Sequence, residues 1–183
     1  MGTDISFVLE YKEKSDDKWI GTIEPISYID FYDKKMETIE NFIPHASSLS
    51  AVHFEPRIPI LFYILCGRFT GNLAFYTRKH SDAIVLPNTI APEPRGMPID
   101  ASIHSFFYLM VDNPHNVKHS YVNLDEILSY KWHKEKVNIP GYEFHENTLV
   151  REPVNKHDFL EYIKVLKRVF EGKDARLVFA FDQ

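Results

Sequence analysis

The sequence predicts an α+β fold, in which an antiparallel or mixed β-sheet is flanked by three to four helices. Two observations lead to this class. Segments with strand composition stand near both ends of the chain, at 4–13 ("DISFVLEYKE") and 175–183 ("ARLVFAFDQ"). The most regular amphipathic pattern, at 155–172, predicts a helix directly before the last strand. Because the 183 residues contain no repeat and no low-complexity linker, we expect a single domain over 1–183.

The N-terminal half is predicted to hold a hairpin, a helix and a buried apolar segment. Residues 5–11 alternate in polarity, and 18–26 follow a polar turn as the second strand of a hairpin. Apolar residues recur at steps of three and four over 29–43, which predicts an amphipathic helix. The run at 57–69 is apolar on all sides, so a buried strand stays open. Gly67 stands where a helix C-cap glycine would, and we favour the helix.

The C-terminal half is predicted to alternate strands, helices and loops. Asn123 and Asn155 each precede a periodic apolar pattern and are expected to cap a helix. The sequence Asp-Asn-Pro at 112–114 marks a turn. The prediction places strands at 72–78, 82–86, 118–122 and 175–183, helices at 100–110, 123–132 and 155–172, a proline-bearing loop at 87–98 and irregular chain at 138–154.

Composition argues against several classes of protein. The net charge of −5 and the isoelectric point of about 6.0 argue against a duplex-DNA binder, which normally presents a basic face. The longest apolar run is about half a membrane span, and the first residues carry no basic leader. We therefore expect a cytoplasmic protein without a membrane partner. The single cysteine, Cys66, lies within that apolar run, which fits a structural thiol in a reducing compartment.

The stretch "APEPRGMPID" at 91–100 places an Arg-Gly pair between prolines. Proline fixes the backbone and lowers the entropy lost when a loop becomes ordered. In one interpretation the loop is a preorganised arm that presents Arg95 to a phosphate or carboxylate, with the Gly96 amide close by. In the other interpretation the loop is a rigid lid, and Arg95 pairs with an acidic residue of its own protein. Asp100 or Ser102 is expected to cap the helix that follows, and Asp100 is also a candidate for the same site.

Two further segments offer groups to an anionic ligand. Arg57 and Arg68 flank the apolar run, and in a helix they would be roughly 16 Å apart, so at most one belongs to a given phosphate site. His119 and Ser120 stand just ahead of a predicted helix start, whose free N–H groups suit an anion, and Tyr121 offers a ring for base stacking. The predicted ligand site draws on Arg57, Arg68, Arg95, Gly96, Asp100, His119, Ser120 and Tyr121.

Motifs for catalysis or cofactor binding do not occur in the sequence. The nine histidines include no H-x-H or H-E-x-x-H spacing, and no G-x-S-x-G, P-loop or dinucleotide fingerprint is present. The sequence therefore predicts no cofactor and no metal, and it favours binding over catalysis. An enzyme stays open as an alternative, with His104, His115 and His119 as general acid/base groups or metal ligands.

Several segments together resemble a group of uncharacterised phage and prophage proteins. They are "DISFVLE" followed by Trp19, "RIPILFYILCGR", "PRGMPIDAS", "HSYVNLDEIL" and "ARLVFAFDQ", spread from end to end of the chain. Relatives in that group tend to carry two histidines in the "HS" stretch, whereas here His119 is followed by Ser120, Tyr121 and Val122. The resemblance implies a small accessory protein of phage origin in the cytosol of a bacterial host. Such proteins include sponges, which sequester nucleotide signals of bacterial immunity, and enzymes that cleave those signals.

The favoured hypothesis is a counter-defence protein that binds and sequesters a nucleotide-derived signal. Arginines would hold its phosphates, and Tyr121, Phe106 or Trp132 would stack on the base. The alternatives are a phosphodiesterase-like enzyme that cleaves such a nucleotide, and a protein-binding inhibitor of a host factor that uses an exposed aromatic patch. Aromatic residues make up 14% of the chain, and this content together with the strand-rich ends also allows for a homo-oligomer.

Overall fold

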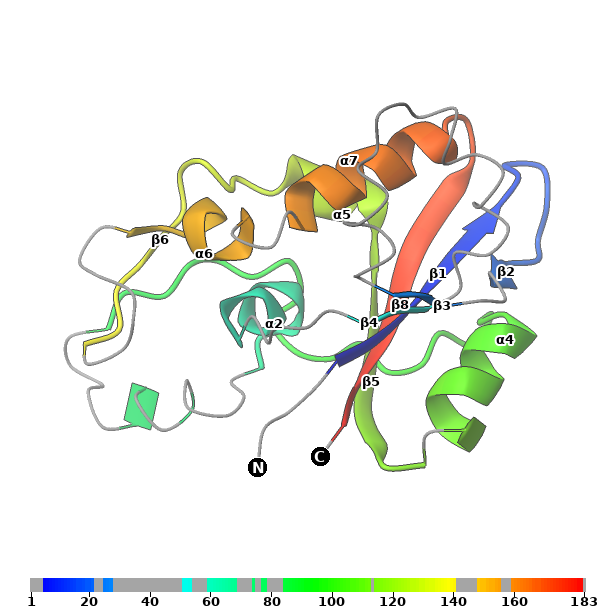
Figure 1. The fold of residues 1–183 in the computed structure, drawn as a ribbon, viewed down its shortest axis with the longest axis horizontal. Coiled ribbons are helices and arrows are strands. Elements are labelled where there is room, and N and C mark those ends of the chain that lie inside the picture. Colours follow the sequence, from blue (N-terminus) through cyan, green and yellow to red (C-terminus); the bar gives the residue numbers. More distant parts are fainter. Residues whose placement is uncertain are drawn as a thin grey trace.

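The protein has an α+β fold built on one mixed six-stranded sheet (Figure 1), as the sequence predicts. Its strands run over Ile5–Lys12 (β1), Ile20–Gly21 (β2), Pro25–Ser27 (β3), Ala51–His53 (β4), Asn116–Asn123 (β5) and Asp174–Asp182 (β8). The order is β3-β4-β1-β8-β5, with β2 paired to β1, and only β3 and β4 run parallel among the described strands. The computed structural model describes residues 5–21, 25–27, 51–53, 59–68, 74, 77–78, 84–112, 114–140, 148–155 and 159–182.

Strands β1 and β8 come from opposite ends of the described chain and pair along the whole length of β1. Phe7 lies opposite Phe179, and Val8 lies opposite Val178. Because side chains alternate along a strand, Phe7 and Phe179 face one layer of the protein, while Val8 and Val178 face the other. The prediction that both ends of the sequence contribute strands is confirmed.

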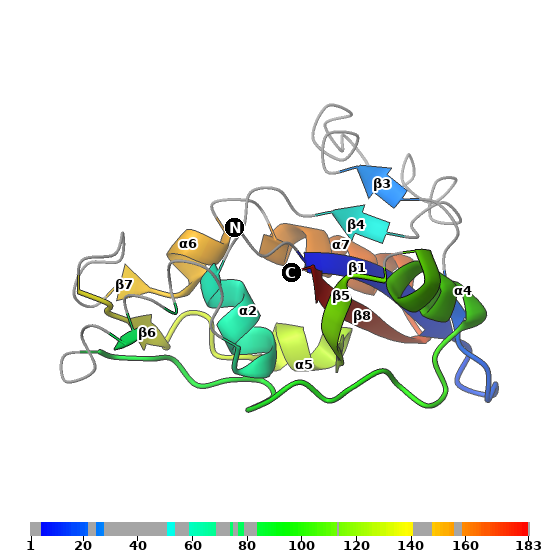
Figure 2. The same cartoon turned by 90° about the horizontal axis from the view of Figure 1, so that it is seen from below.

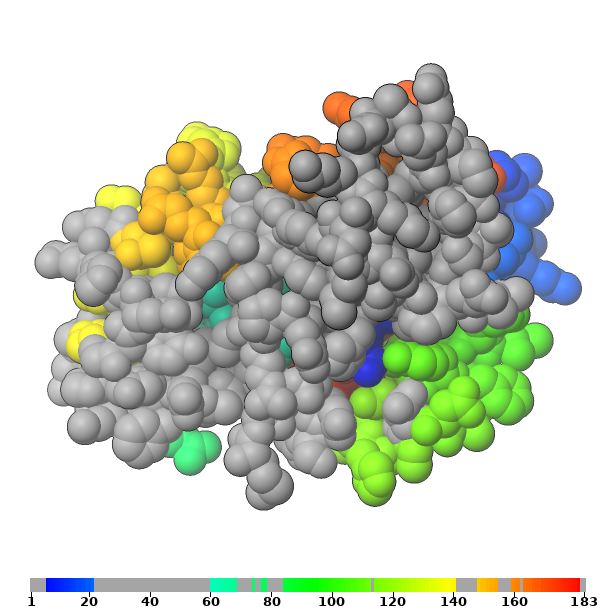
Figure 3. Space-filling view, viewed as in Figure 1, coloured from blue at the N-terminus to red at the C-terminus, as the bar shows by residue number. Residues whose placement is uncertain are grey.

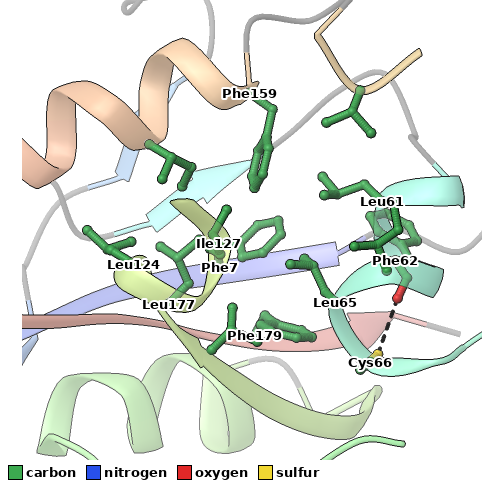
Figure 4. Close-up of a cluster of buried hydrophobic side chains, with 14 of the residues drawn as sticks. Phe7, Leu61, Phe62, Leu65, Cys66, Leu124, Ile127, Phe159, Leu177 and Phe179 are labelled. Carbon is green, nitrogen blue, oxygen red and sulfur yellow. Dashed lines mark hydrogen bonds between the residues drawn. The ribbon is translucent and has the colours of Figure 1, made fainter. Parts of the chain in front are cut away.

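One face of the sheet is covered by α2 (Pro59–Cys66), α5 (Leu124–Ser129) and α7 (Phe159–Val169), while α6 (Arg151–Asn155) lies to the side and packs against α2 and α7. Figure 4 shows how their side chains meet the sheet: Phe62 of α2, Ile127 of α5 and Phe159 of α7 surround Phe7 and Phe179. All of these side chains are buried. Burial of this apolar surface, at about 25 cal/mol per Å², is the main source of stability for a domain of this size.

The opposite face of the sheet carries α4 (Ile103–Phe106), which continues as the π-helix η4 (Phe107–Asp112) and lies beside β5 and β1 (Figure 2). Ser102 caps this segment, since its hydroxyl accepts the Ser105 N–H at 3.1 Å, as the prediction for this position allowed. Leu109 is fully buried against Val8 and Val178. The second layer is thus thinner than the first, and much of its outer side faces solvent.

A second, two-stranded sheet pairs β6 (Lys136–Val137) with β7 (Thr148–Leu149). Next to it, Val85 forms an isolated bridge with Asn138. The predicted strand at 82–86 is therefore wrong in extent, since its described residues contribute only this bridge. Pro87 follows at once, and proline has no N–H with which to continue a ladder.

Two further segments differ from the sequence prediction. Within 72–78, predicted as a strand, the described residues Ala74, Thr77 and Arg78 are helical. The run is short and its leucine and alanine favour a helix, so periodicity alone could not decide between the two states. α6 lies where irregular chain was predicted, because a single turn tolerates a proline near its start. The helix predicted at 29–43 lies outside the described residues.

The helices predicted at 57–69, 100–110, 123–132 and 155–172 are present, but Asn155 is the last residue of α6 instead of the cap of α7, which is described from Phe159. α2 ends at Cys66, directly before Gly67, whose φ of +68° is the left-handed conformation typical of a C-cap glycine. α5 begins after Asn123, whose backbone N–H donates to the carboxylate of Glu126 at 2.8 Å. Within the described ranges, no helix combines the length and the apolar character that crossing a membrane requires.

Cys66 is a buried thiol at the C-terminal end of α2. Its Sγ donates to the Phe62 carbonyl oxygen at 3.5 Å, the dashed line in Figure 4. Burial raises the pKa of Cys66 to about 11, so very little thiolate is present at neutral pH. The thiol is therefore poorly suited to nucleophilic catalysis.

Candidate functional site

Residues 90–102, which we call the strap, cross the molecule as an extended segment between α2 and α4. The strap contains the proline-rich stretch singled out in the sequence. In Figure 2 it belongs to the long green trace that runs below α5 and β5 towards α4. Main-chain groups of the strap are bonded at three places: the end of α2, the outer edge of β5 and the β1–β8 pair.

The first attachment joins the strap to the last turn of α2. The Ile90 N–H donates to the Ile64 carbonyl oxygen at 2.7 Å, which satisfies one of the carbonyls left free at a helix end. Gly67 then lies against the carbonyl of Pro92, in the space that a Cβ atom would need. Glycine is therefore required here for two reasons, its positive φ and this close approach.

The second attachment covers the outer edge of β5. The Arg95 N–H donates to the Ser120 hydroxyl at 3.1 Å, and the Gly96 N–H donates to the His119 carbonyl at 2.9 Å. The β5–β8 register shifts between Val117 and Ser120, and Lys118 has a φ of +54°. Since β5 is an edge strand, the strap occupies main-chain groups that would otherwise be open to another strand.

The Arg95 side chain is bound within its own protein. Its guanidinium donates to both carboxylate oxygens of Glu126, at 2.7 and 2.9 Å, and to the Tyr121 carbonyl at 3.2 Å. It also lies 5.4 Å from the Tyr121 ring centroid. The hydrogen bond from Arg95 lowers the pKa of Glu126, against the opposing effect of burial. This arrangement matches the interpretation in which Arg95 pairs with an acid of its own chain, and its role toward a ligand stays a prediction.

The third attachment centres on Arg176, which is buried in β8. Its Nε donates to Glu10 at 2.7 Å and its Nη1 donates to Asp100 at 2.9 Å, while the Trp19 ring centroid lies 3.8 Å from the guanidinium carbon. The fully buried Glu10 also accepts the Ser102 N–H at 2.6 Å. The cluster ties the end of the strap to the centre of the sheet.

Asp100 lies at the exposed end of this cluster. Burial acts to raise the pKa of its carboxyl, but hydrogen bonds from Arg176 and the Trp19 indole outweigh it, and the net pKa is lowered. The sequence analysis missed Glu10 and Arg176. Both are charged residues within apolar strands predicted from the sequence, but only the register of β1 and β8 shows that they lie directly opposite each other.

A cavity of about 680 Å³ lies where the first part of the strap meets the end of α2. Its volume falls within the usual range for small-molecule sites, roughly 300–1,000 Å³. Two arginines, one threonine and one glutamate provide polar groups, and proline, isoleucine and leucine side chains provide apolar walls. The lining consists of Gly67, Arg68, Ala74, Thr77, Arg78, Ile84, Leu86, Pro92, Glu93 and Pro94.

Arg68 is the unusual residue of this cavity. Its Nη1 is shielded from solvent and has no hydrogen-bond partner within the part of the chain that the structure describes. The guanidinium carbon lies 4.8 Å from the ring centroid of Phe181, which holds the side chain in place. Burial lowers the pKa of Arg68, yet a guanidinium stays charged in proteins. A fixed charge with an unused donor is suited to an anion.

Of the eight predicted site residues, seven lie in the described part of the chain, at three places. Arg57 lies outside the described residues. Arg68 lines the cavity, where it is joined by Arg78, which the sequence analysis did not select, and by strap residues that precede Arg95. His119 has its Nε2 3.2 Å from the Leu109 carbonyl oxygen of η4. The remaining five predicted residues meet along the strap and its attachments: Arg95, Gly96, Asp100, Ser120 and Tyr121.

Among the histidines, the cysteine and the carboxylates that the structure describes, no group of three or more is arranged to hold a metal ion. His104 and His115 are exposed, and neither lines the cavity. The histidine alternative therefore gains no support from the described geometry.

Known proteins offer no guide to this site. The chain matches no protein-family model, no curated protein and no solved structure. A fold by itself does not define a function. What the protein binds must therefore be inferred from the chemistry of its own side chains.

Proposed function

We propose that the protein binds and sequesters a small anionic ligand of the nucleotide class in the cavity at Arg68. The observation that carries the proposal is the Arg68 guanidinium, because Arg68 lines the cavity and its shielded Nη1 has no hydrogen-bond partner among the described residues. Leaving a buried donor unsatisfied costs roughly 1–3 kcal/mol, and more for a charged group. A phosphate oxygen bonded to Arg68 would remove this cost and add a charge-assisted hydrogen bond.

The remaining walls support a ligand with one charged and one flat apolar part. Arg78 adds a second cation to the lining. Pro92, Pro94 and Leu86 offer apolar surfaces against which the faces of a base can pack. Glu93 provides an acceptor for a ligand amino or hydroxyl group. Together these groups fit a nucleotide better than inorganic phosphate, which would leave the apolar walls unused.

The attachment of the strap favours tight binding. Ile90 and Arg95, on either side of the cavity wall, are both fixed by main-chain hydrogen bonds. A wall that is already ordered loses little entropy when a ligand arrives. The prolines at 92 and 94 have the same effect, because they restrict the free chain.

The lining supports capture rather than turnover. Among the described residues of the cavity, Glu93 is the only carboxylate and there is no histidine. A phosphodiesterase needs a positioned base or a metal-bound water next to the phosphate. The resemblance to phage and prophage proteins extends the proposal, since a sponge for a nucleotide signal of bacterial immunity needs only to bind.

Thermal-shift titrations test this function with defined probes: inorganic phosphate, adenosine monophosphate and cyclic dinucleotides. A ligand that binds only the folded state raises its stability by RT ln(1 + [L]/Kd), about 2.7 kcal/mol at a hundredfold excess over Kd. We expect a nucleotide to raise the melting temperature of the wild type and of Arg95→Ala, and to leave Arg68→Met unchanged. An equal shift in Arg68→Met would show that the cavity is not the site.

A further inference from the structure

The outer side of α4 and η4 exposes an unusual number of large apolar side chains. Figure 3 shows the segment of α4 and η4, in green, on the outer surface of the molecule. Ile99 is fully exposed and Ile103 is 74% exposed, and the other four side chains are 42–52% exposed. We call this surface the apolar face; it consists of Ile99, Ile103, Phe106, Phe107, Met110 and Val111.

The segment of α4 and η4 is apolar on both sides, unlike α7. Inward, Leu109 is buried against Val8 and Val178. In α7, by contrast, the outward positions Lys164 and Arg168 are charged and solvated. A helix that is apolar all round is normally buried on all sides. The apolar face is therefore incomplete in a single copy of the chain.

The area of the apolar face matches what one partner contributes to a stable dimer. If each of these side chains offers about 200 Å² when fully exposed, the six exposed fractions leave roughly 700 Å² in contact with solvent. A standard interface buries about 800 Å² on each partner. Phenylalanine and methionine, which supply half of the face, are enriched at the centres of interfaces.

We infer that two copies of the chain associate by packing their apolar faces against each other across a two-fold axis. In such an isologous contact the same surface serves both partners, so one patch of this size is sufficient. The chain has a net charge of −5, so two copies repel each other electrostatically. This repulsion is weakest where the surfaces in contact carry no charged side chains. The six side chains of the apolar face carry no charge.

A membrane surface is a poorer partner for the apolar face than a second copy of the chain. Helices that lie on membranes flank their apolar side with lysine and arginine, which attract anionic lipids. Here the nearest charged residues along the chain, Asp100 and Asp112, are both acidic. The face also belongs to a protruding helix rather than a groove, which suits packing against an identical helix.

Sedimentation velocity over a wide range of protein concentrations tests the dimer. We expect the sedimentation data of the wild type to give a molecular mass twice the 21.5 kDa of one chain. We expect the variants Val111→Glu and Phe107→Glu to give the mass of a single chain. Val85→Glu is the matched control, because Val85 is also 50% exposed but lies in the bridge to Asn138. This control is expected to remain dimeric.

Circular dichroism and melting curves establish that each variant is folded. The substituted side chains are half exposed, so we expect native spectra; Ile103→Glu, at a more exposed position, replaces any variant that fails to fold. Three results would overturn the inference. They are a wild type that is a single chain at every concentration, a dimer that persists in both variants, and a dimer that is lost equally in Val85→Glu.

Discussion

Gly67 and Pro92 lie so close together that no side chain fits between them. The carbonyl of Pro92 occupies the position of the missing Cβ, and Gly67 has a φ of +68°. This contact joins the end of α2 to the strap at the wall of the cavity, next to Arg68. The proline-rich stretch therefore braces the protein, and the same brace shapes the proposed ligand site.

Replacing Gly67 by alanine is expected to lower the free energy of unfolding by about 3 kcal/mol. The left-handed backbone costs a non-glycine residue roughly 1–2 kcal/mol, and displacing the Pro92 carbonyl adds to this cost. Urea unfolding measures the change. Gly96→Ala is the control, since Gly96 has a φ of +85° but open space around it, so we expect a loss of only about 1 kcal/mol. Equal losses in the two variants would refute the steric part of this account.

Arg68→Met is expected to be as stable as the wild type, or slightly more stable. Methionine removes a shielded charge with an unused donor, and its thioether can retain contact with the Phe181 ring. Arg95→Met should instead lose about 1–2 kcal/mol, because it breaks the contacts with Glu126 and the Tyr121 carbonyl. Thermal unfolding of the ligand-free proteins compares the two. A large loss in Arg68→Met would mean that Arg68 serves the fold rather than a ligand.

Glu10→Ala is expected to destabilise the protein by about 3–5 kcal/mol. Glu10 and Arg176 form a buried pair at 2.7 Å, and removal of Glu10 leaves the buried Arg176 with only the half-exposed Asp100, and leaves the Ser102 N–H without its acceptor. Asp100→Asn provides the comparison, because Asp100 bonds the same arginine from a half-exposed position and should cost about 1 kcal/mol. Chemical denaturation measures the free energy of unfolding of both variants. A Glu10→Ala variant as stable as Asp100→Asn would contradict the role given to the cluster.

The pairing of Arg95 with Glu126 predicts a specific pH dependence. The pKa of Glu126 is lowered in the folded protein from its ordinary value of 4.5. The pair's contribution, about 1 kcal/mol, is therefore fully present above pH 4.5 and is lost as pH falls through the lower folded pKa. Melting curves of the wild type and Glu126→Gln should differ at neutral pH and converge in acid. A difference that stays constant down to low pH would exclude this ion pair as its source.

The exposed pair of Glu161 and Lys164 on α7 serves as a control for this pH experiment. Both side chains are more than half exposed, and such pairs contribute only about 0.2–0.5 kcal/mol on a helix surface. Glu161→Gln should therefore track the wild type closely at every pH.

The fold class and several elements were predictable because their signals are local. β1, β8 and α7 follow from hydrophobic periodicity, and the ends of α2 and α5 follow from Gly67 and Asn123. The segment at 72–78 was not predictable, because a short apolar run fits a helix and a strand equally well.

The candidate site was only partly predictable, because its contacts join distant parts of the chain. The stretch around Arg95 stood out by its prolines, but its partner Glu126 lies 31 residues away. Glu10 and Arg176, 166 residues apart, required the register of two strands. The cavity depends on three separate segments, and no local pattern indicates that the Nη1 of Arg68 is shielded.

The most direct test of the proposed function is mass spectrometry of the small molecules that heat denaturation releases from the purified protein. The protein should come from bacteria, with and without activation of nucleotide immune signalling. We predict an intact phosphate-bearing molecule, near one per site, from the wild type and from Arg95→Ala but not from Arg68→Met. Release of the same molecule from Arg68→Met, of a cleaved product, or of nothing in either condition would contradict sequestration at the Arg68 cavity.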